Sequence, residues 1–170
     1  MIQIGEEPYD GEAAVALVAA MHADINERYA HSIVDLTTEE RAADDDAHAE
    51  EVTPAMVTAP LGVFLVARLN GEAVGCGALK PFESEPGVAE IKRMYTQPLA
   101  RRRGVSRAVL TRLEQRGAAL GYRRLKLETG TAQPEALALY EAQGWERITP
   151  YGRYGDDPQS VCFAKDVGPA

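Results

Sequence analysis

The 170-residue sequence is poor in several residue types, and each shortage excludes a class of protein. It contains only two cysteines, Cys76 and Cys162, which are too few for a disulfide framework and lie at no spacing typical of a metal site. No apolar run approaches the roughly 18 residues that a membrane-spanning helix needs, and the N-terminal residues do not resemble a secretion signal. We therefore expect a cytoplasmic protein with no membrane partner and no bound metal.

Basic residues are outnumbered by acidic ones, with 18 Lys and Arg against 26 Asp and Glu and a formal net charge of −8. Proteins that bind nucleic acid generally present a basic surface, so we expect no nucleic-acid partner. Three consecutive arginines, Arg101–Arg103, stand directly before Gly104. The alternative is an interaction protein that uses this run on nucleic acid or an acidic partner, and strongly salt-dependent binding would identify it.

The remaining composition, 45% hydrophobic and 26% charged, is that of an ordinary globular protein. A chain of this length fits one domain, so we expect a single domain over residues 1–170. Residues 11–30 place apolar side chains at steps of three or four, which predicts an amphipathic helix. The stretch from there to residue 60 is polar and acidic, and its segment 41–51 predicts a solvated loop or a short helix.

Strand and turn signals follow in regular succession after residue 60. Asn70-Gly71 is the strongest short hairpin signal, and Gly75 and Gly77 in the returning strand predict a bulge or a close backbone approach. Strands are expected at residues 62–69, 72–80, 88–97, 123–129, 145–151 and 160–165, and helices at 104–120 and 133–144. The order β-α-(loop)-β-β-β-α-β-α-β-β predicts an α/β (α+β) domain with a mixed, mostly antiparallel twisted sheet flanked by helices.

The arginine run stands where a helix is expected to begin. The N-terminus of a helix exposes unpaired N–H groups and a partial positive charge, and a glycine there lets a ligand approach the backbone. Together these features form a site for phosphate groups, to which arginines add fork-shaped donors. From charge alone, a set of solvated arginines explains the run equally well. No Walker-type GxxxxGK[ST] loop is present.

Two short patterns lie around this helix start. RRRGVS, residues 101–106, fits [QR]-x-x-G-x-[GA] except that Ser106 takes the last place. MYTQP, residues 94–98, fits a strand end of the form hydrophobic-Tyr-Val-x-Pro, with Thr96 in the place of valine. Serine is small and a good cap donor, so its departure does not conflict with the first pattern.

A third pattern, QPEALALYEAQGW at residues 133–145, fits Asn-Pro-x-Ala-x-x-Leu-Tyr-Glu-x-x-Gly-Phe, with Gln133 in the place of asparagine. With these three patterns in order, residues 61–164 resemble the GNAT family of N-acetyltransferases. The stretches GCGALK (75–80), KLETGT (126–131) and 151–165 together resemble a bacterial subgroup with undefined substrates. The resemblance implies that 61–164 form a core that binds acetyl-coenzyme A. Residues 1–60 would then be a variable region on the acceptor side.

The same resemblance implies where acetyl-coenzyme A is bound and what the protein does with it. The backbone at the strand end would bind the pantetheine arm, and the arginine run would bind the phosphates. The implied binding residues are Met94, Tyr95, Thr96, Arg101, Arg102, Arg103, Gly104, Val105, Ser106, Arg107 and Gln133. Because neighbouring side chains point in different directions, we expect only part of the run to touch the cofactor. Family members are often dimers, so a homodimer is one option.

Acetyl transfer to an amine needs a base, because an alkylamine with a pKa of about 10.4 is protonated at neutral pH. Glu90 matches the place of a catalytic glutamate in several family members, and it could act directly or through a water. The alternative is a strand glutamate that faces solvent or pairs with an arginine. Tyr140 matches a tyrosine that protonates the departing thiolate, and its alternative is a tyrosine packed in the core.

The resulting prediction is an N-acetyltransferase that moves acetyl from acetyl-coenzyme A to a primary amine by direct attack in a ternary complex. That amine could belong to a small molecule, a lysine or a protein N-terminus. The alternative function is a sensor that binds coenzyme A without turnover. Weaker candidates are Cys76, which is better explained as a buried strand residue, and three isolated histidines. The loop that contains Tyr151 could border the acceptor pocket or be an ordinary turn.

Overall fold

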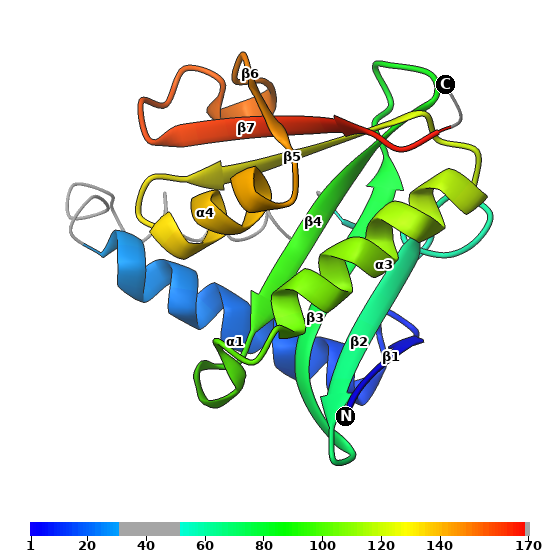
Figure 1. The fold of residues 1–170 in the computed structure, drawn as a ribbon, viewed down its shortest axis with the longest axis vertical. Helices are drawn as coiled ribbons and strands as arrows, with labels where there is room; N and C mark the ends of the chain where they lie inside the picture. The colour runs from blue at the N-terminus through cyan, green and yellow to red at the C-terminus, as the bar shows by residue number, and fades with distance from the viewer. Residues whose placement is uncertain (31–51, 169–170) are drawn as a thin grey trace.

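A seven-stranded sheet forms the centre of the computed structural model, which describes residues 1–30 and 52–168 (Figure 1). The acidic segment 41–51 lies outside the described residues. The strands are β1 (Ile2–Glu6), β2 (Val63–Leu69), β3 (Glu72–Pro81), β4 (Val88–Thr96), β5 (Arg124–Gly130), β6 (Glu146–Ile148) and β7 (Ser160–Asp166). Their order in the sheet is β1-β2-β3-β4-β5-β7-β6. Only the β4–β5 pair is parallel, which confirms the predicted mixed sheet.

Helices cover both faces of this sheet. In Figure 1, α3 (Val105–Ala119) and α4 (Pro134–Ala142) lie in front of it, and α1 (Glu12–Tyr29) lies behind it. Strand β2 shows why both faces must be covered: Leu65 packs in the core beneath α3, whereas its neighbours Phe64 and Val66 pack in the core beneath α1. Successive strand residues point to opposite faces, and a strand that is apolar on both faces is stable only between two layers.

The local signals in the hairpin correspond to the backbone that forms there. Asn70 and Gly71, with φ of 52° and 89°, make the turn between β2 and β3. At Gly77, where the register of β3 and β4 shifts, a Cβ would lie 2.8 Å from the side chains of Leu113 and Val109 of α3. The glycine therefore allows α3 to pack closely on the sheet, which confirms the predicted close approach.

The parallel strands β4 and β5 pair only along part of their length. Val88–Ile91 of β4 pairs with Arg124–Leu127 of β5, and the rest of β4 has no partner on β5. Just beyond the paired part, Arg93 has φ of 57° and lies at a bulge opposite β3, a feature that bends a strand. The two strands diverge from that point (Figure 1), so the sheet opens at the C-terminal end of β4.

The predicted helices and strands after residue 60 are all present, with small differences at their ends. The strand expected at residues 145–151 is the largest difference, since β6 ends at Ile148 and a 3₁₀ turn occupies Gly152–Tyr154. Pro150 lies between them and lacks the N–H that a longer strand would need. Among the described residues, no helix has the length and apolar character needed to cross a membrane.

Candidate active site

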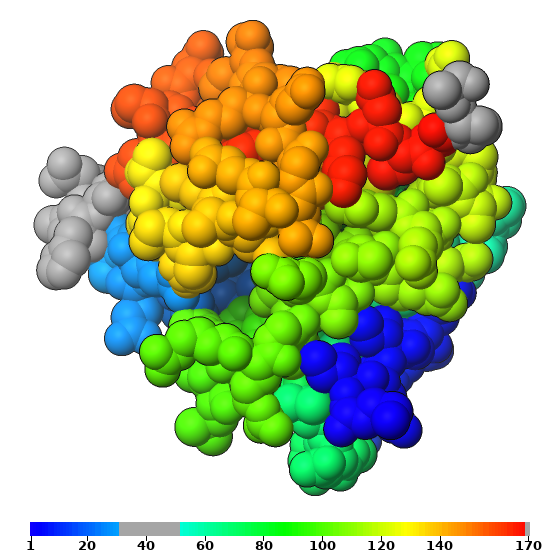
Figure 2. Space-filling view, viewed as in Figure 1, coloured from blue at the N-terminus to red at the C-terminus, as the bar shows by residue number. Residues whose placement is uncertain are grey.

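The open end of the sheet contains a cavity of about 700 Å³. Figure 2 shows the hollow between the yellow atoms of α4 and the green atoms around the start of α3, with the blue atoms of α1 behind it. Four parts of the chain contribute: the C-terminal half of α1, the end of β4, the start of α3 with the turn before it, and α4. The lining residues are Asp24, Arg28, Met94, Tyr95, Thr96, Ala100, Arg101, Arg102, Gly104, Val105, Ser106, Arg107, Gln133, Glu135, Ala136, Leu139 and Tyr140.

The turn before α3, residues 98–104, is called the arginine turn below. It begins with a 3₁₀ turn at Pro98–Ala100 and ends at Gly104, whose φ of 82° is left-handed. That conformation is strained for residues with a side chain, so glycine is required here by the backbone. No side chain caps α3, and the residues of its first turn line the cavity. Unpaired N–H groups therefore belong to the cavity wall.

The arginines of this turn have different surroundings. The Nε of Arg101 donates a hydrogen bond to the carbonyl oxygen of Thr96 at 3.1 Å, and its Nη2 lies 2.7 Å from Oδ1 of Asp24. Arg102 and Arg107 line the cavity, whereas Arg103 does not. The arginine run is thus divided, as expected from the different directions of neighbouring side chains.

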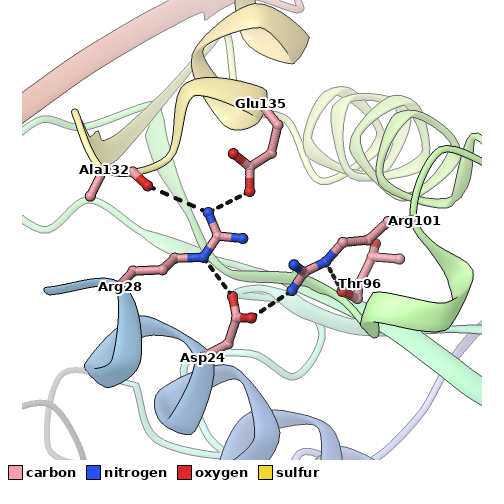
Figure 3. Close-up of polar contacts among 6 residues, drawn as sticks. All are labelled: Asp24, Arg28, Thr96, Arg101, Ala132 and Glu135. Carbon is pink, nitrogen blue, oxygen red and sulfur yellow. Dashed lines mark hydrogen bonds and ion pairs between the residues drawn. The ribbon is translucent and has the colours of Figure 1, made fainter. Parts of the chain in front are cut away.

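Asp24 of α1 also binds Arg28, which in turn reaches α4 (Figure 3). The Nε of Arg28 lies 2.9 Å from Oδ2 of Asp24, and its Nη1 lies 2.5 Å from Oε1 of Glu135 and 3.4 Å from the carbonyl oxygen of Ala132. Burial raises the pKa of Asp24, but Arg101 and Arg28 outweigh it and the net pKa is lowered. Burial lowers the pKa of Arg28, but the carboxylates of Glu135 and Asp24 together have the larger effect, so its net pKa is raised.

The sequence analysis missed these three residues, Asp24, Arg28 and Glu135. The only available signal was the i,i+4 spacing of Asp24 and Arg28, which predicts an ion pair on one helix face. Nothing in that spacing indicates that the pair faces a cavity or that its partners come from other elements.

Thr96 and Ser106, two of the residues that depart from the family patterns, contact each other. Their hydroxyl oxygens are 2.9 Å apart, so a hydrogen bond joins the end of β4 to the first turn of α3. A valine and a glycine or alanine at these places could not make this bond. The two departures from the patterns therefore meet in one hydrogen bond.

Tyr140 is packed in the core and also belongs to the cavity wall. Its side chain is buried against Phe163 and Trp145, with ring centroids 5.6 and 6.1 Å away. The residue also lines the cavity, and no described residue makes a hydrogen bond to its hydroxyl. Burial raises the pKa of this hydroxyl above its ordinary value, so it remains protonated at neutral pH.

Glu90 does not line the cavity, and it neither faces solvent nor pairs with an arginine. The residue is 5% exposed and accepts a hydrogen bond of 3.1 Å on Oε1 from the hydroxyl of Tyr151. The Nζ atoms of Lys92 and Lys80 lie 3.6 and 3.7 Å from its two oxygens. These four residues are called the Glu90 cluster. Glu90 is therefore paired with lysines and a tyrosine inside the protein.

Tyr151 packs against residues that are distant in the sequence. Its ring meets that of Phe82 edge to face at 5.1 Å, and the ammonium of Lys126 lies 5.4 Å from the Tyr151 ring centroid. Burial raises the pKa of Tyr151, and the charge of Glu90 raises it further, so the hydroxyl is a permanent donor at neutral pH. The sequence placed Tyr151 only in a loop with two interpretations, and the structure shows that it binds Glu90.

The weaker candidates have ordinary surroundings. Cys76 is buried, its thiol lies 3.2 Å from the carbonyl oxygen of Arg93, and burial, opposed by Arg93, raises its pKa to about 12. Such a thiol is a poor nucleophile at neutral pH. His22 is part of α1, and the other two histidines, His31 and His48, lie outside the described residues. Residues 1–30 and 52–168 contain no group of three metal-ligating side chains.

The family model and the relatives that match this chain are all acetyltransferases. The model of the acetyltransferase (GNAT) family matches residues 26–145, more than half of the chain. The chain is 45% identical over 104 residues to the IAA acetyltransferase of Azospirillum brasilense, a match that covers 61% of this chain and 67% of that protein. It is 40% identical over 98 residues to the uncharacterised N-acetyltransferase YsnE of Bacillus subtilis, covering 56% of this chain and 64% of YsnE. The matches thus span about two thirds of these relatives.

Solved structures share the whole fold. A candidate acyl-CoA N-acyltransferase from Klebsiella pneumoniae superposes with a TM-score of 0.73 at 28% identity, covering 98% of both chains. A GNAT acetyltransferase from Elizabethkingia anophelis, crystallised with acetyl-CoA bound, superposes with a TM-score of 0.62 at 17% identity over 97% of both chains. The second likeness concerns the fold alone.

Proposed function

The chain belongs to the GNAT acetyltransferase family and is an acetyl-CoA-dependent acyltransferase; from this premise we propose that it transfers acetyl to a primary amine by direct attack in a ternary complex. The observation that carries the proposal is the cavity at the open end of the sheet. It gathers all the residues that the sequence patterns predicted for the cofactor and for acid catalysis, except Arg103.

The cavity wall fits the chemistry of acetyl-CoA. A Cβ built at Gly104 would meet no protein atom within 4 Å, so the space above the uncapped start of α3 is open to a phosphate group. Arg102 and Arg107 add positive charge at that place. The end of β4 has no partner on β5, which leaves backbone groups of Met94–Thr96 to bind an extended arm as an added strand.

In this proposal the residues of the chain divide the proton transfers. Bound acetyl-CoA supplies the thioester: the amine nitrogen forms a bond to the acetyl carbon, and the carbon–sulfur bond breaks. Glu90 accepts a proton from the amine through a water, because its carboxylate lies outside the cavity lining. The hydroxyl of Tyr140, which makes no hydrogen bond to a described residue, gives its proton to the departing thiolate and regains one through solvent from the nitrogen that becomes the amide.

The acceptor is proposed only as a class, a primary amine of a small molecule, a lysine or a protein N-terminus. The net charge of −8 favours the approach of a cationic molecule. A thiol-release assay with acetyl-CoA and a panel of spermidine, Nα-blocked lysine and a peptide with a free N-terminus tests the proposal. We expect at least one amine to raise thiol release and to appear acetylated by mass spectrometry. Thiol release that is the same with and without every amine would contradict amine transfer.

A further inference from the structure

Four side chains of alternating charge lie in a row across one side of the cavity: Glu135, Arg28, Asp24 and Arg101 (Figure 3). They are called the ionic chain below. Each link is a contact of 2.5 to 2.9 Å between a guanidinium nitrogen and a carboxylate oxygen. All four residues line the cavity, and the two central ones belong to α1.

The ionic chain connects the two strands that have separated. At one end, Arg101 donates to the carbonyl oxygen of Thr96, the last residue of β4. At the other end, Arg28 donates to the carbonyl oxygen of Ala132, just after β5. Helix α1 is also close to the end of β5, because a Cβ at Gly130 would lie 1.8 Å from the hydroxyl oxygen of Tyr29. The chain thus bridges, through α1, the gap that the sheet leaves open.

Arg101 joins the arginine turn to the ionic chain. It is the first arginine of the turn and the first residue of the RRRGVS pattern, and its guanidinium is turned toward Thr96 and Asp24. A planar guanidinium held by two acceptors has a fixed orientation. Because the turn leads from Arg101 to Gly104 within three residues, fixing Arg101 restricts where the N–H groups at the start of α3 can point.

We propose that Asp24 is a positioning residue of the acetyl-CoA site: it holds Arg101 against the end of β4 and so fixes the arginine turn. This inference rests on the proposed cofactor site. The inference predicts that Asp24 strengthens acetyl-CoA binding, whereas charge repulsion alone predicts that it weakens binding. A carboxylate beside a phosphate site should weaken the binding of an anionic cofactor, whereas a carboxylate that shapes the site strengthens it. The sign of the effect therefore decides between the two.

The test compares Asp24→Asn with Glu27→Gln. Both variants remove one negative charge from α1, and Glu27 is exposed and lies outside the cavity lining. Calorimetric titration with acetyl-CoA should show about tenfold weaker binding for Asp24→Asn, the loss of a charge-assisted hydrogen bond, and nearly wild-type binding for Glu27→Gln. The loss should persist at high salt, since a change of turn geometry is not screened. In steady-state kinetics it should raise the KM for acetyl-CoA rather than lower kcat.

Arg101→Lys tests the same inference independently of whether Asp24→Asn folds. Lysine keeps the charge but cannot present a planar fork to both acceptors, so we expect weakening similar to that of Asp24→Asn. The double variant should bind no more weakly than Arg101→Lys, because both changes break one contact. Wild-type or tighter binding by folded Asp24→Asn, or by Arg101→Lys, overturns the inference.

A third variant separates this failure from failure of the cofactor site itself. If Gly104→Asp binds acetyl-CoA like wild type, the site assignment is wrong and the inference falls with it. If Gly104→Asp loses binding while Asp24→Asn retains it, the site stands and only the positioning role of Asp24 is overturned.

Discussion

The arginine turn and the Glu90 cluster are both assembled around β4, yet they are built in opposite ways. The turn is contiguous: its residues follow one another from Pro98 to Gly104, and a left-handed glycine and an uncapped helix give it its properties. The Glu90 cluster is assembled from β3, β4 and the segment after β6, and its contacts join residues up to 61 positions apart. A contiguous site leaves a pattern in the sequence, whereas a dispersed site leaves only isolated polar residues.

The two regions also have different proposed functions, cofactor binding for the arginine turn and proton transfer for the Glu90 cluster. The turn is suited to binding the cofactor, since it offers backbone N–H groups and arginines to phosphates. The Glu90 cluster holds a carboxylate beside one tyrosine hydroxyl and two lysine ammonium groups, and in the proposal this carboxylate accepts the proton of the amine. Changes in the turn should therefore alter affinity, and changes around Glu90 should alter rate.

Gly104→Asp is expected to have the largest effect. It forces a residue with a side chain into φ of 82° and adds negative charge where phosphates should bind. Losing two charge-assisted hydrogen bonds of about 1.5–3 kcal/mol each weakens binding by about 10³-fold. The matched control is Gly121→Asp, because Gly121 has a similar φ of 90° and no neighbour within 4 Å of a Cβ but lies beyond the other end of α3. Calorimetry with acetyl-CoA that shows equal affinities for the two variants would remove the turn from the cofactor site.

Tyr140→Phe tests whether the cavity also contributes to the chemistry. Removing the hydroxyl should lower turnover by about 10²-fold, a typical contribution of a general acid, and leave acetyl-CoA affinity unchanged. Because burial raises the pKa of Tyr140, this group should remain protonated, and wild-type rate should not fall on its account as pH rises from 7 to 10. The thermal midpoint should be unchanged, since no described residue bonds the hydroxyl.

The control for this variant is Tyr122→Phe, which removes a hydroxyl that donates to the carbonyl oxygen of Leu61 at 2.6 Å. It should lower the midpoint and not the rate. An unchanged rate in Tyr140→Phe would make Tyr140 a packing residue alone.

Tyr151→Phe is expected to have the smallest effect and tests the Glu90 cluster. It removes the donor to Glu90 Oε1 and keeps the ring against Phe82. With one hydrogen bond to a charged group lost, turnover should fall by about tenfold, with acetyl-CoA affinity retained. Tyr154→Phe, three residues further along the same loop, is the control. Weaker acetyl-CoA binding with an unchanged turnover would instead assign Tyr151 to cofactor binding.

Much of the fold was predictable from the sequence because its signals are local. At three places the backbone favours asparagine or glycine: the turn at Asn70-Gly71, the close contact of Gly77 with α3, and the left-handed Gly104. The extent of β4–β5 pairing was not predictable. It depends on the bulge at Arg93 and on packing from both faces, which no short pattern encodes.

The candidate site was predictable to the same degree and for the same reason. The arginine turn and Tyr140 belong to contiguous patterns, and the structure brings them to one cavity. Asp24, Arg28 and Glu135 were missed because a charged side chain on a helix looks ordinary until its partner is known, and for the same reason Tyr151 could be assigned only to a loop with two interpretations. The Thr96–Ser106 pair was visible only as two separate departures from a pattern, and their hydrogen bond required the fold.

The most direct test of the proposed division between binding and proton transfer is a paired measurement on Glu90→Gln. Its acetyl-CoA affinity would be measured by calorimetry, and its amine-dependent thiol release at saturating acetyl-CoA from pH 6 to 9, beside the exposed control Glu83→Gln. We expect turnover about 10²-fold below wild type with an altered pH profile and an unchanged Kd for acetyl-CoA. A wild-type rate across this pH range, or a Kd that weakens as much as the rate falls, would contradict the account.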